Sequence, residues 1–182
     1  MLNSPRRRYR GIALLTMLVL LAMLTIITVI GARLAVLEER MAGNTRDRDL
    51  ALRAAEMGLR DAERDLLNTV PGASRAISGC SGFSADCGKS TPVLTDDGLC
   101  YSRDGYAAPV WQTTDIMSAA PSVPYGGITQ ATAIAGVYAQ PRYLIECLPK
   151  PDGYHYRITV RAQGSKPGTT VMLEEIFTPG ER

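Results

Sequence analysis

The hydrophobic pattern divides the chain into an apolar run, a striped helix, a loop-rich middle and a strand-rich end. The apolar run, residues 12–32, contains 21 residues and no charge. At about 1.5 Å per residue, a helix of this length crosses the roughly 30 Å hydrocarbon core of a bilayer. Arg33 ends the run. The sequence therefore predicts one transmembrane helix over residues 12–32.

Two other interpretations of this run fit less well. A secretory signal peptide has an apolar region of about 7–15 residues followed by a small-residue cleavage site, whereas this run is longer and no convincing site follows it. A helix buried in a soluble core does not need a basic cluster on one flank: Arg6, Arg7, Arg8 and Arg10. Because basic flanks stay in the cytoplasm, we expect everything after Arg33 to lie outside it.

A second helical pattern continues over residues 33–68, which contain no proline. Apolar residues recur every three or four positions, which aligns them on one helix face: Leu52, Ala55, Leu59, Ala62 and Leu66. Val70-Pro71-Gly72 then ends the element. A helix over residues 12–68 would be about 85 Å long, so its upper half needs a partner for the apolar stripe.

Charged pairs add to this second helical pattern. Asp49 precedes Arg53, and Glu56 precedes Arg60, each by four residues. Pairs of this kind stabilise a helix by a few tenths of a kcal/mol each. Fifteen of the residues in 33–68 are charged, so we expect the remaining faces of the helix to meet water or polar neighbours.

The C-terminal third carries the pattern of a sheet. Large apolar side chains alternate with polar ones over ten residues, which predicts a strand with one buried face: Tyr154, Tyr156, Ile158, Val160 and Ala162. Residues 142–148 and 169–177 are its expected neighbours, joined through turn-rich connectors. We expect an α+β domain in which Leu52, Leu59 and Leu66 pack against Tyr156, Ile158 and Val160.

Residues 69–141 are rich in Gly, Ser, Thr and Pro, and we interpret them as loops with short strands. Long irregular segments are unusual in compact domains unless something staples them. Four cysteines are available outside the cytoplasm, where disulfides form: Cys80, Cys87, Cys100 and Cys147. Three connectivities are possible, of which we favour Cys80–Cys87 with Cys100–Cys147. The spacing lacks the short paired steps of a zinc site.

Composition and charge narrow the function classes. The chain has 182 residues, 46% of them hydrophobic, and a net charge of +2, which suits one folded domain and does not suit a strongly basic nucleic-acid binder. The first eleven residues alone carry +4. The positive excess is therefore confined to the N-terminus, as in a segment that orients a membrane helix.

Catalytic chemistry has little support in the sequence. His155 is the only histidine and lies on the polar face of the predicted strand, so a hydrolytic triad or zinc site has few groups to use. No glycine-rich phosphate loop follows a strand. Asp96, Asp97 and Asp104 could supply oxygen ligands to calcium, although an acidic turn explains them equally well. We expect neither an enzyme nor a cofactor.

The N-terminal residues resemble a known signal. A basic leader ends in Arg10-Gly11 and a long apolar helix follows at once, which resembles the class III signal of type IV prepilins. The resemblance implies that a prepilin peptidase cuts between Gly11 and Ile12 and methylates the new N-terminus at Ile12. Residues 1–11 would then be the leader peptide.

Segments beyond the leader resemble PilX-type minor pilins. They are residues 37–44 (LEERMAGN), 46–48 (RDR) and 54–56 (AAE) in the helix, then 99–100 (LC), 108–111 (APVW), 141–146 (PRYLIE) and 156–162 (YRITVRA). The resemblance implies a type IV pilin-like fold: a long N-terminal helix, transmembrane in its lower half, packed on a C-terminal antiparallel sheet with a disulfide-stapled middle. Residues 33–68 would be the exported helix half and residues 69–182 the periplasmic domain.

Thr16 departs from the pilin pattern. Major pilins carry a glutamate at the fifth mature position, and Thr16 is fifth after the expected cut. A carboxylate inside a bilayer is kept for a partner because it is costly there, and in the family this partner is the N-terminal amine of a neighbour. A subunit without it suits a priming or tip position. The simpler interpretation is that Thr16 bonds back to a helix carbonyl.

The resemblance implies a minor pilin that sits in the bacterial inner membrane, with its C-terminal domain in the periplasm, and then enters the tip of a type IV pilus. Its expected partners are other minor pilins, the major pilin, the prepilin peptidase, the inner-membrane assembly platform and a tip adhesin, with no nucleic acid. Cell adhesion or motility would be the role of such a pilus. The alternatives are a type II secretion pseudopilin and a membrane-tethered periplasmic binding domain.

Overall fold

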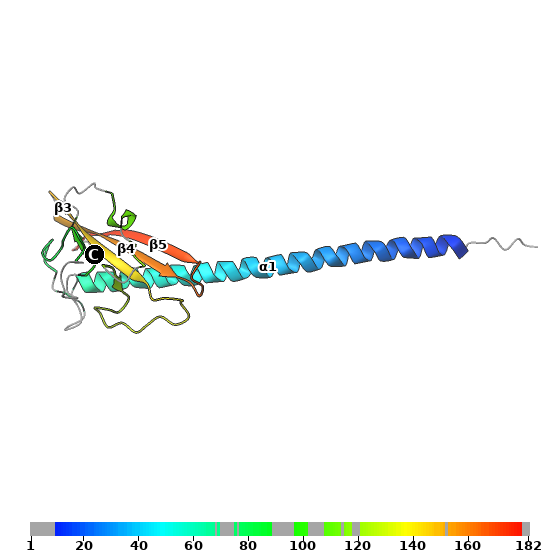
Figure 1. The fold of residues 1–182 in the computed structure, drawn as a ribbon, viewed down its shortest axis with the longest axis horizontal. Coiled ribbons are helices and arrows are strands. Elements are labelled where there is room, and N and C mark those ends of the chain that lie inside the picture. The colour runs from blue at the N-terminus through cyan, green and yellow to red at the C-terminus, as the bar shows by residue number, and fades with distance from the viewer. Residues whose placement is uncertain are drawn as a thin grey trace, which may run out of the picture. The chain divides into compact units, whose positions relative to one another are not determined.

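The computed structural model describes residues 10–67, 69, 75, 77–88, 97–101, 108–113, 115–117, 121–151 and 153–179. Figure 1 shows its elements, which are helix α1 (Arg10–Leu66), strands β1 (Leu99–Tyr101), β2 (Val123–Pro124), β3 (Arg142–Lys150), β4 (Gly153–Gln163) and β5 (Thr170–Phe177), and a short 3-10 helix, η1 (Val110–Gln112). The chain divides into two compact units, Met1–Thr45 and Arg46–Arg182.

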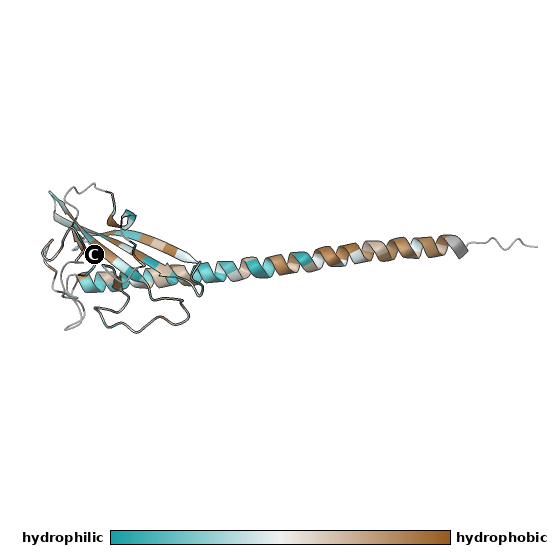
Figure 2. Ribbon diagram, viewed as in Figure 1, coloured by the Kyte–Doolittle hydropathy of each residue, from teal (hydrophilic) through white to brown (hydrophobic). Residues whose placement is uncertain are grey.

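The first unit contains the N-terminal part of α1. Every described side chain from residue 12 to residue 45 is exposed, and Figure 2 shows that the start of the helix is almost entirely apolar. Among the described residues, this is the one helix whose length and composition would let it cross a membrane. The predicted long helix is confirmed, and its large apolar side chains between residues 12 and 45 are exposed.

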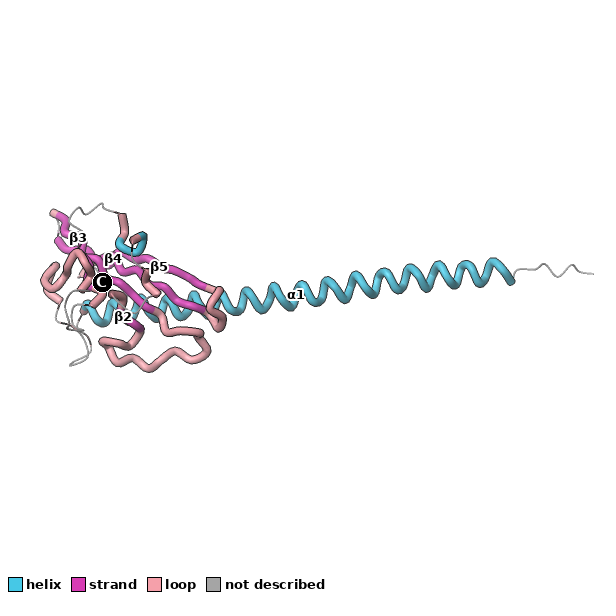
Figure 3. The backbone as a smooth tube through the Cα atoms, in the orientation of Figure 1, coloured by secondary structure: helices cyan, strands magenta, loops and turns pink. Residues whose placement is uncertain are grey.

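The second unit is built around a sheet whose order is β1-β3-β4-β5, with β2 also pairing with β3. Strands β3, β4 and β5 are antiparallel, as the sequence predicted, and Ile145 lies opposite Ile158 while Val160 lies opposite Leu173. β1 runs parallel to β3, which the sequence did not predict. Figure 3 shows the long loop that leads from β2 back to β3.

The upper half of α1 packs on one face of this sheet through small residues. Ala51, Ala54, Ala55 and Ala62 are buried, and Gly58 lies so close to β4 that a Cβ atom there would be 2.6 Å from Val160 Cγ1. Small side chains let the helix backbone approach the sheet closely, because a larger group would collide with the branched strand residues. The core therefore forms between a helix face of alanine and glycine residues and the larger side chains of β3 and β4.

Two details of the predicted packing are wrong. Leu52 is 38% exposed, whereas Leu59 is partly buried and Leu66 is buried, because the contact face is centred on the alanines and Gly58 and Leu52 lies beside it. Tyr154 is 53% exposed, because the buried alternation of β4 begins only at Tyr156. The packing of Tyr156, Ile158 and Val160 against the helix is confirmed.

The favoured disulfide pairing is also wrong. The structure joins Cys80 to Cys147 and Cys87 to Cys100. Because β1 pairs in parallel with β3, Cys100 lies in the strand next to the one that holds Cys147. The two cysteines nevertheless face opposite sides of the sheet. Cys100 bonds to Cys87 on the face away from α1, and Cys147 bonds to Cys80 on the face that packs against α1. Two disulfides are present, as the sequence predicted.

The second face of the sheet is covered as well. Leu144 packs with Cys87, Cys100 and Ile116, and η1 lies beside them through Val110 and Trp111. β3 therefore buries side chains on both faces, which explains why its apolar residues do not alternate regularly with polar ones.

Candidate functional site

The predicted processing site lies at the beginning of α1. Gly11 is the second residue of the helix and Ile12 follows it with 65% of its surface exposed. A peptidase cut between these two residues is a prediction that the fold neither requires nor tests. The chemistry of such a site would belong to the peptidase, and this chain would supply only the peptide bond.

Thr16 has a local hydrogen-bonding partner. Its hydroxyl donates to the carbonyl oxygen of Ala13 at 3.0 Å, and Thr25 and Thr28 bond back to their own helix in the same way. A hydroxyl satisfied inside its own helix can lie in an apolar environment without a second partner. The hydrogen bond that the simpler interpretation of Thr16 expects is therefore present, and this side chain offers no charge to a neighbour.

Residues 12–32 present a continuous exposed apolar surface. Its large side chains are 44–73% exposed along the whole run. Exposed apolar surface on this scale marks a protein or membrane interaction site in a folded protein. The surface can bind only through apolar contact, either with lipid or with the apolar faces of other helices.

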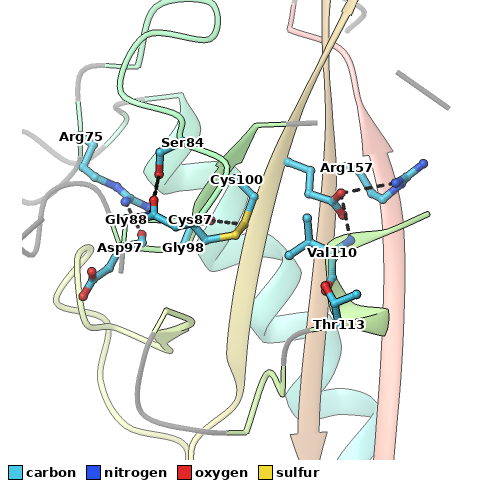
Figure 4. Close-up of a disulfide and its surroundings, with 12 residues drawn as sticks. Arg75, Ser84, Cys87, Gly88, Asp97, Gly98, Cys100, Val110, Thr113 and Arg157 are labelled. Atoms are coloured by element: carbon cyan, nitrogen blue, oxygen red, sulfur yellow. Dashed lines mark hydrogen bonds and ion pairs between the residues drawn. A yellow bond between two sulfur atoms is a disulfide. The ribbon is translucent and has the colours of Figure 1, made fainter. Parts of the chain in front are cut away.

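A buried ion pair anchors the end of α1. Asp65 is fully buried and forms a salt bridge with Arg75, whose Nε lies 3.1 Å from each carboxylate oxygen. The Tyr143 hydroxyl donates to Asp65 Oδ2 at 3.0 Å, and burial together with the Asp65 charge raises the pKa of Tyr143. Arg75 Nη1 also donates to the Asp97 carbonyl oxygen at 2.6 Å (Figure 4). The Asp65–Arg75 pair thus joins α1, β3 and two loops.

Asp61, one turn earlier, holds the loop after β2. Its Oδ2 accepts from the Gly126 amide at 2.8 Å and its Oδ1 accepts from the Thr129 hydroxyl. Burial raises the pKa of Asp61, and the bonds from Thr129 and Gly126 oppose this rise. Because these two donors satisfy both oxygens, the loop is fixed against the helix without a charged partner.

Asp47 holds the turn between β4 and β5. Its Oδ1 accepts from the amide of Ser165 at 2.5 Å and from the Ser165 hydroxyl at 2.6 Å. Hydrogen bonds from Ser165 and Thr169 lower the pKa of Asp47. We call Asp47, Asp61 and Asp65 the helix clasps, since each ties α1 to a different part of the second unit.

The helix clasps were not predicted from the sequence. A signal was present, because the three aspartates occupy the same helix face as Ala51, Ala54 and Gly58. Charged residues on the buried face of a helix are rarely left without partners, so their position alone indicated polar contacts with the domain.

A fourth buried carboxylate lies on the opposite face of the sheet. Glu146 in β3 is 1% exposed, accepts from the Val110 amide at 3.2 Å and lies 3.5 Å from Arg157 of β4. Arg157 also meets Glu174 of β5, which accepts from Trp111 Nε1 at 3.0 Å. Burial raises the pKa of Glu146, opposed by the Val110 amide and Arg157. Figure 4 shows Val110 and Arg157, the two partners of Glu146, near the Cys87–Cys100 disulfide.

Metal-binding groups do not converge in the described residues. There, no three His, Cys, Asp or Glu side chains could hold one metal ion, and His155 Nδ1 lies 2.9 Å from the Thr178 hydroxyl. Of the aspartates considered for calcium, Asp96 and Asp104 lie outside the described residues. A surface hollow of about 530 Å³ lies at the end of α1, lined by Arg60, Glu63, Arg64, Leu67 and Thr69.

The described geometry defines a class of protein: an exposed apolar helix whose upper half is held on a mostly antiparallel, disulfide-linked sheet is the α+β architecture of type IV pilin-like proteins. Comparison with protein families refines this. The PilX N-terminal model matches residues 10–60, and the model of the type IV pilus assembly protein PilX C-terminal region matches residues 96–179. The chain belongs to the PilX family of type IV pilus assembly proteins, a structural family and not a family of enzymes. No curated protein and no solved structure matches it.

Proposed function

We propose that this minor pilin is cut after Gly11, is methylated at Ile12 and is then anchored by residues 12–32 in the bacterial inner membrane. Residues 33–182 lie in the periplasm until the subunit enters a type IV pilus, at or near its tip. There it joins other minor pilins and the major pilin. The prepilin peptidase, the assembly platform and a tip adhesin are its further partners.

One observation carries this proposal: the apolar residues 12–32 are exposed along their whole length. The same surface suits two successive environments, because lipid tails and neighbouring apolar helices both accept side chains that make no hydrogen bonds. A tethered periplasmic domain would need only the first environment. Membership of a pilus assembly family supports the second.

The tip position is supported by Thr16. A subunit inside the shaft has a neighbour on each side, and the pilin glutamate would serve one of these contacts. Here the hydroxyl of Thr16 is satisfied by Ala13 of its own helix. A subunit that offers no carboxylate at this position suits the end of the filament, where one neighbour is missing.

Isolation of sheared filaments from the source bacterium tests processing and assembly together. Mass spectrometry should find a mature chain that begins at N-methylated Ile12. Gly11→Ala should leave the leader attached and remove the chain from the filaments. Gly43→Ala is the matched control, since it makes the same substitution outside residues 12–32 and a Cβ there meets nothing within 4 Å. If Gly11→Ala changed neither the mass nor the surface exposure, a membrane-tethered binding domain would be the better explanation.

The tip position has a separate test. Thr16→Glu should restore the contact that shaft subunits make and move the chain from the filament end into the shaft, as seen by immunogold labelling. Thr16→Gln is the control, because it introduces a side chain of similar size at the same position without the carboxylate. Two results would contradict a tip position. One is that the Thr16→Glu protein is labelled only at the filament ends, like the wild type; the other is that the wild-type protein is labelled along the shaft.

A further inference from the structure

The side of α1 that faces away from the sheet carries a regular series of charges. Basic and acidic residues alternate at steps of three and four, and each sign repeats every seven residues. We call this series the charge ladder; it consists of Arg46, Asp49, Arg53, Glu56, Arg60 and Glu63. Seven residues of helix span roughly 10.5 Å, so each sign recurs at that interval along the axis.

The structure places the charge ladder opposite the buried face. From position 49 onward, each ladder residue comes two positions after a buried one at 47, 51, 54, 58 or 61. Two residues turn a helix by about 200°. Arg46, Asp49, Arg53, Glu56 and Arg60 are accordingly exposed, and Glu63 is half-buried. The ladder thus faces away from the domain that the helix clasps hold.

The ladder charges are not neutralised by one another. The predicted pairs of Asp49 with Arg53 and of Glu56 with Arg60 are not formed as ion pairs. Among the described residues, five of the six ladder side chains make no salt bridge and no side-chain hydrogen bond: Arg46, Asp49, Arg53, Glu56 and Arg60. These charges remain available to a partner.

The membrane anchor restricts which partner can bind. This step rests on the proposed function, in which every pilin stem enters the membrane by its N-terminus and neighbouring stems therefore run parallel. Two parallel copies at equal height would place Arg53 against Arg53 and Glu56 against Glu56, and facing like charges are unfavourable. A displacement of three or four residues, about 5 Å along the axis, places each arginine opposite an acid instead.

We propose that the charge ladder is the surface on which a second pilin stem binds: a parallel helix from another subunit that presents opposite charges at the same seven-residue repeat. The ladder rejects a copy of this chain at equal height in the membrane. It accepts a stem displaced along the axis, which is how neighbours are related in a helical filament. Its role is to select the axial register of the neighbouring subunit.

A swap within the ladder tests this while preserving composition. The variant R46D/D49R/R53E/E56R keeps the net charge but inverts the order of signs. Its amount in sheared filaments should fall at least fivefold relative to wild type. The single variant R53E should lower it in the same direction, whereas R48E should not, because Arg48 is exposed on the same helix but lies outside the ladder. Thermal unfolding in detergent should match that of wild type for every variant.

Cross-linking gives the register directly. A photoreactive phenylalanine analogue at position 53 should cross-link to the stem of another pilin subunit, and one at position 48 should not. Cross-links that join position 53 of two copies of this chain would overturn the inference.

Different results would refute the proposed function and the charge ladder. Wild-type chain missing from the filaments would refute the proposed function. If the wild type were in the filaments and the swap variant were present there in the same amount, the role of the charge ladder would be refuted. The proposed function would be unaffected.

Discussion

A carboxylate buried on a helix face is unfavourable unless its oxygens have donors, and the helix clasps show three ways of supplying them. Asp65 uses a guanidinium and a phenol, Asp61 uses an amide and a hydroxyl, and Asp47 accepts the amide and the hydroxyl of Ser165 on its Oδ1. The donors come from loops and from β3, so each aspartate fixes a segment that has little apolar surface of its own. The irregular parts of the second unit thereby gain a defined position.

Asp65→Asn should destabilise the second unit severely. The substitution leaves Arg75 buried without its counter-charge, and breaking a buried pair in this way costs about 3–5 kcal/mol. Urea unfolding of the detergent-solubilised chain measures this loss. Asp49→Asn is the control, because Asp49 is exposed and makes no ion pair. A loss below about 1 kcal/mol would show that water enters this site and solvates Arg75.

Glu146 should make stability depend on pH. Its folded-state pKa is raised by burial, so the folded chain binds the proton more tightly than the unfolded chain does. The stability that this provides is complete below the ordinary pKa of glutamate and is lost as the pH rises through the folded-state value. The Val110 amide and the Arg157 guanidinium contact Glu146 directly, and Glu174 contacts the same Arg157.

Glu146→Gln isolates this contribution, because Asp61 and the other titrating groups are the same in both proteins. The unfolding free energy of wild type, relative to the variant, should decrease as the pH rises from the ordinary glutamate range toward neutrality. Urea unfolding at a series of pH values provides the comparison. Curves that stay parallel over this range would mean that Glu146 has the same pKa in the folded and unfolded chains.

At the scale of elements, the decisive contact is that of α1 with β4. Four buried alanines and Gly58 give the helix a shallow surface, so the specificity of the contact resides in the strand residues that fill the space. An apolar periodicity based on leucine predicts this contact poorly. Leu52 belongs to the predicted stripe and is exposed, while Ala51 and Ala54 were not in it and are buried.

Gly58→Ala should therefore be destabilising, although alanine is the better helix former. The new Cβ would lie 2.6 Å from Val160 Cγ1 and 3.3 Å from Pro141 Cβ, and overpacking of this kind costs about 1–3 kcal/mol. Gly43→Ala is a matched control, since nothing lies within 4 Å of its position and the change should stabilise the helix by up to about 1 kcal/mol. Thermal unfolding of both variants would compare them. A Gly58→Ala protein as stable as the wild type would show that the helix can move away from β4.

At the scale of the whole molecule, sequence patterns predicted the secondary-structure elements and their order along the chain. They predicted less well which distant segments contact one another. The long helix, the three antiparallel strands and the loop-rich middle follow from periodicity and turn residues, because these signals are local. The cysteine pairing depends on β1 running parallel to β3, a contact between segments more than 40 residues apart. No local pattern reports this, and the short-loop choice of Cys80 with Cys87 was wrong for that reason.

The two disulfides should contribute unequally. Cys80–Cys147 closes a segment of 67 residues and Cys87–Cys100 one of 13. Restriction of the unfolded chain predicts losses of about 4 and about 3 kcal/mol when each is removed. Unfolding of C80S/C147S and C87S/C100S would rank them, and non-reducing peptide mapping would identify the pairs. Recovery of a peptide linking Cys80 to Cys87 would contradict the structure.

The distribution of the helix clasps has a mechanical consequence. They are spread over 19 residues of α1, from Asp47 to Asp65, and each grips a different segment of the domain. A force along the helix axis would act on all three helix clasps at once, in shear. A force across the axis would break their hydrogen bonds one clasp at a time. The domain is thus built to resist tension transmitted through its own helix, and to yield most readily when its sheet is peeled away sideways.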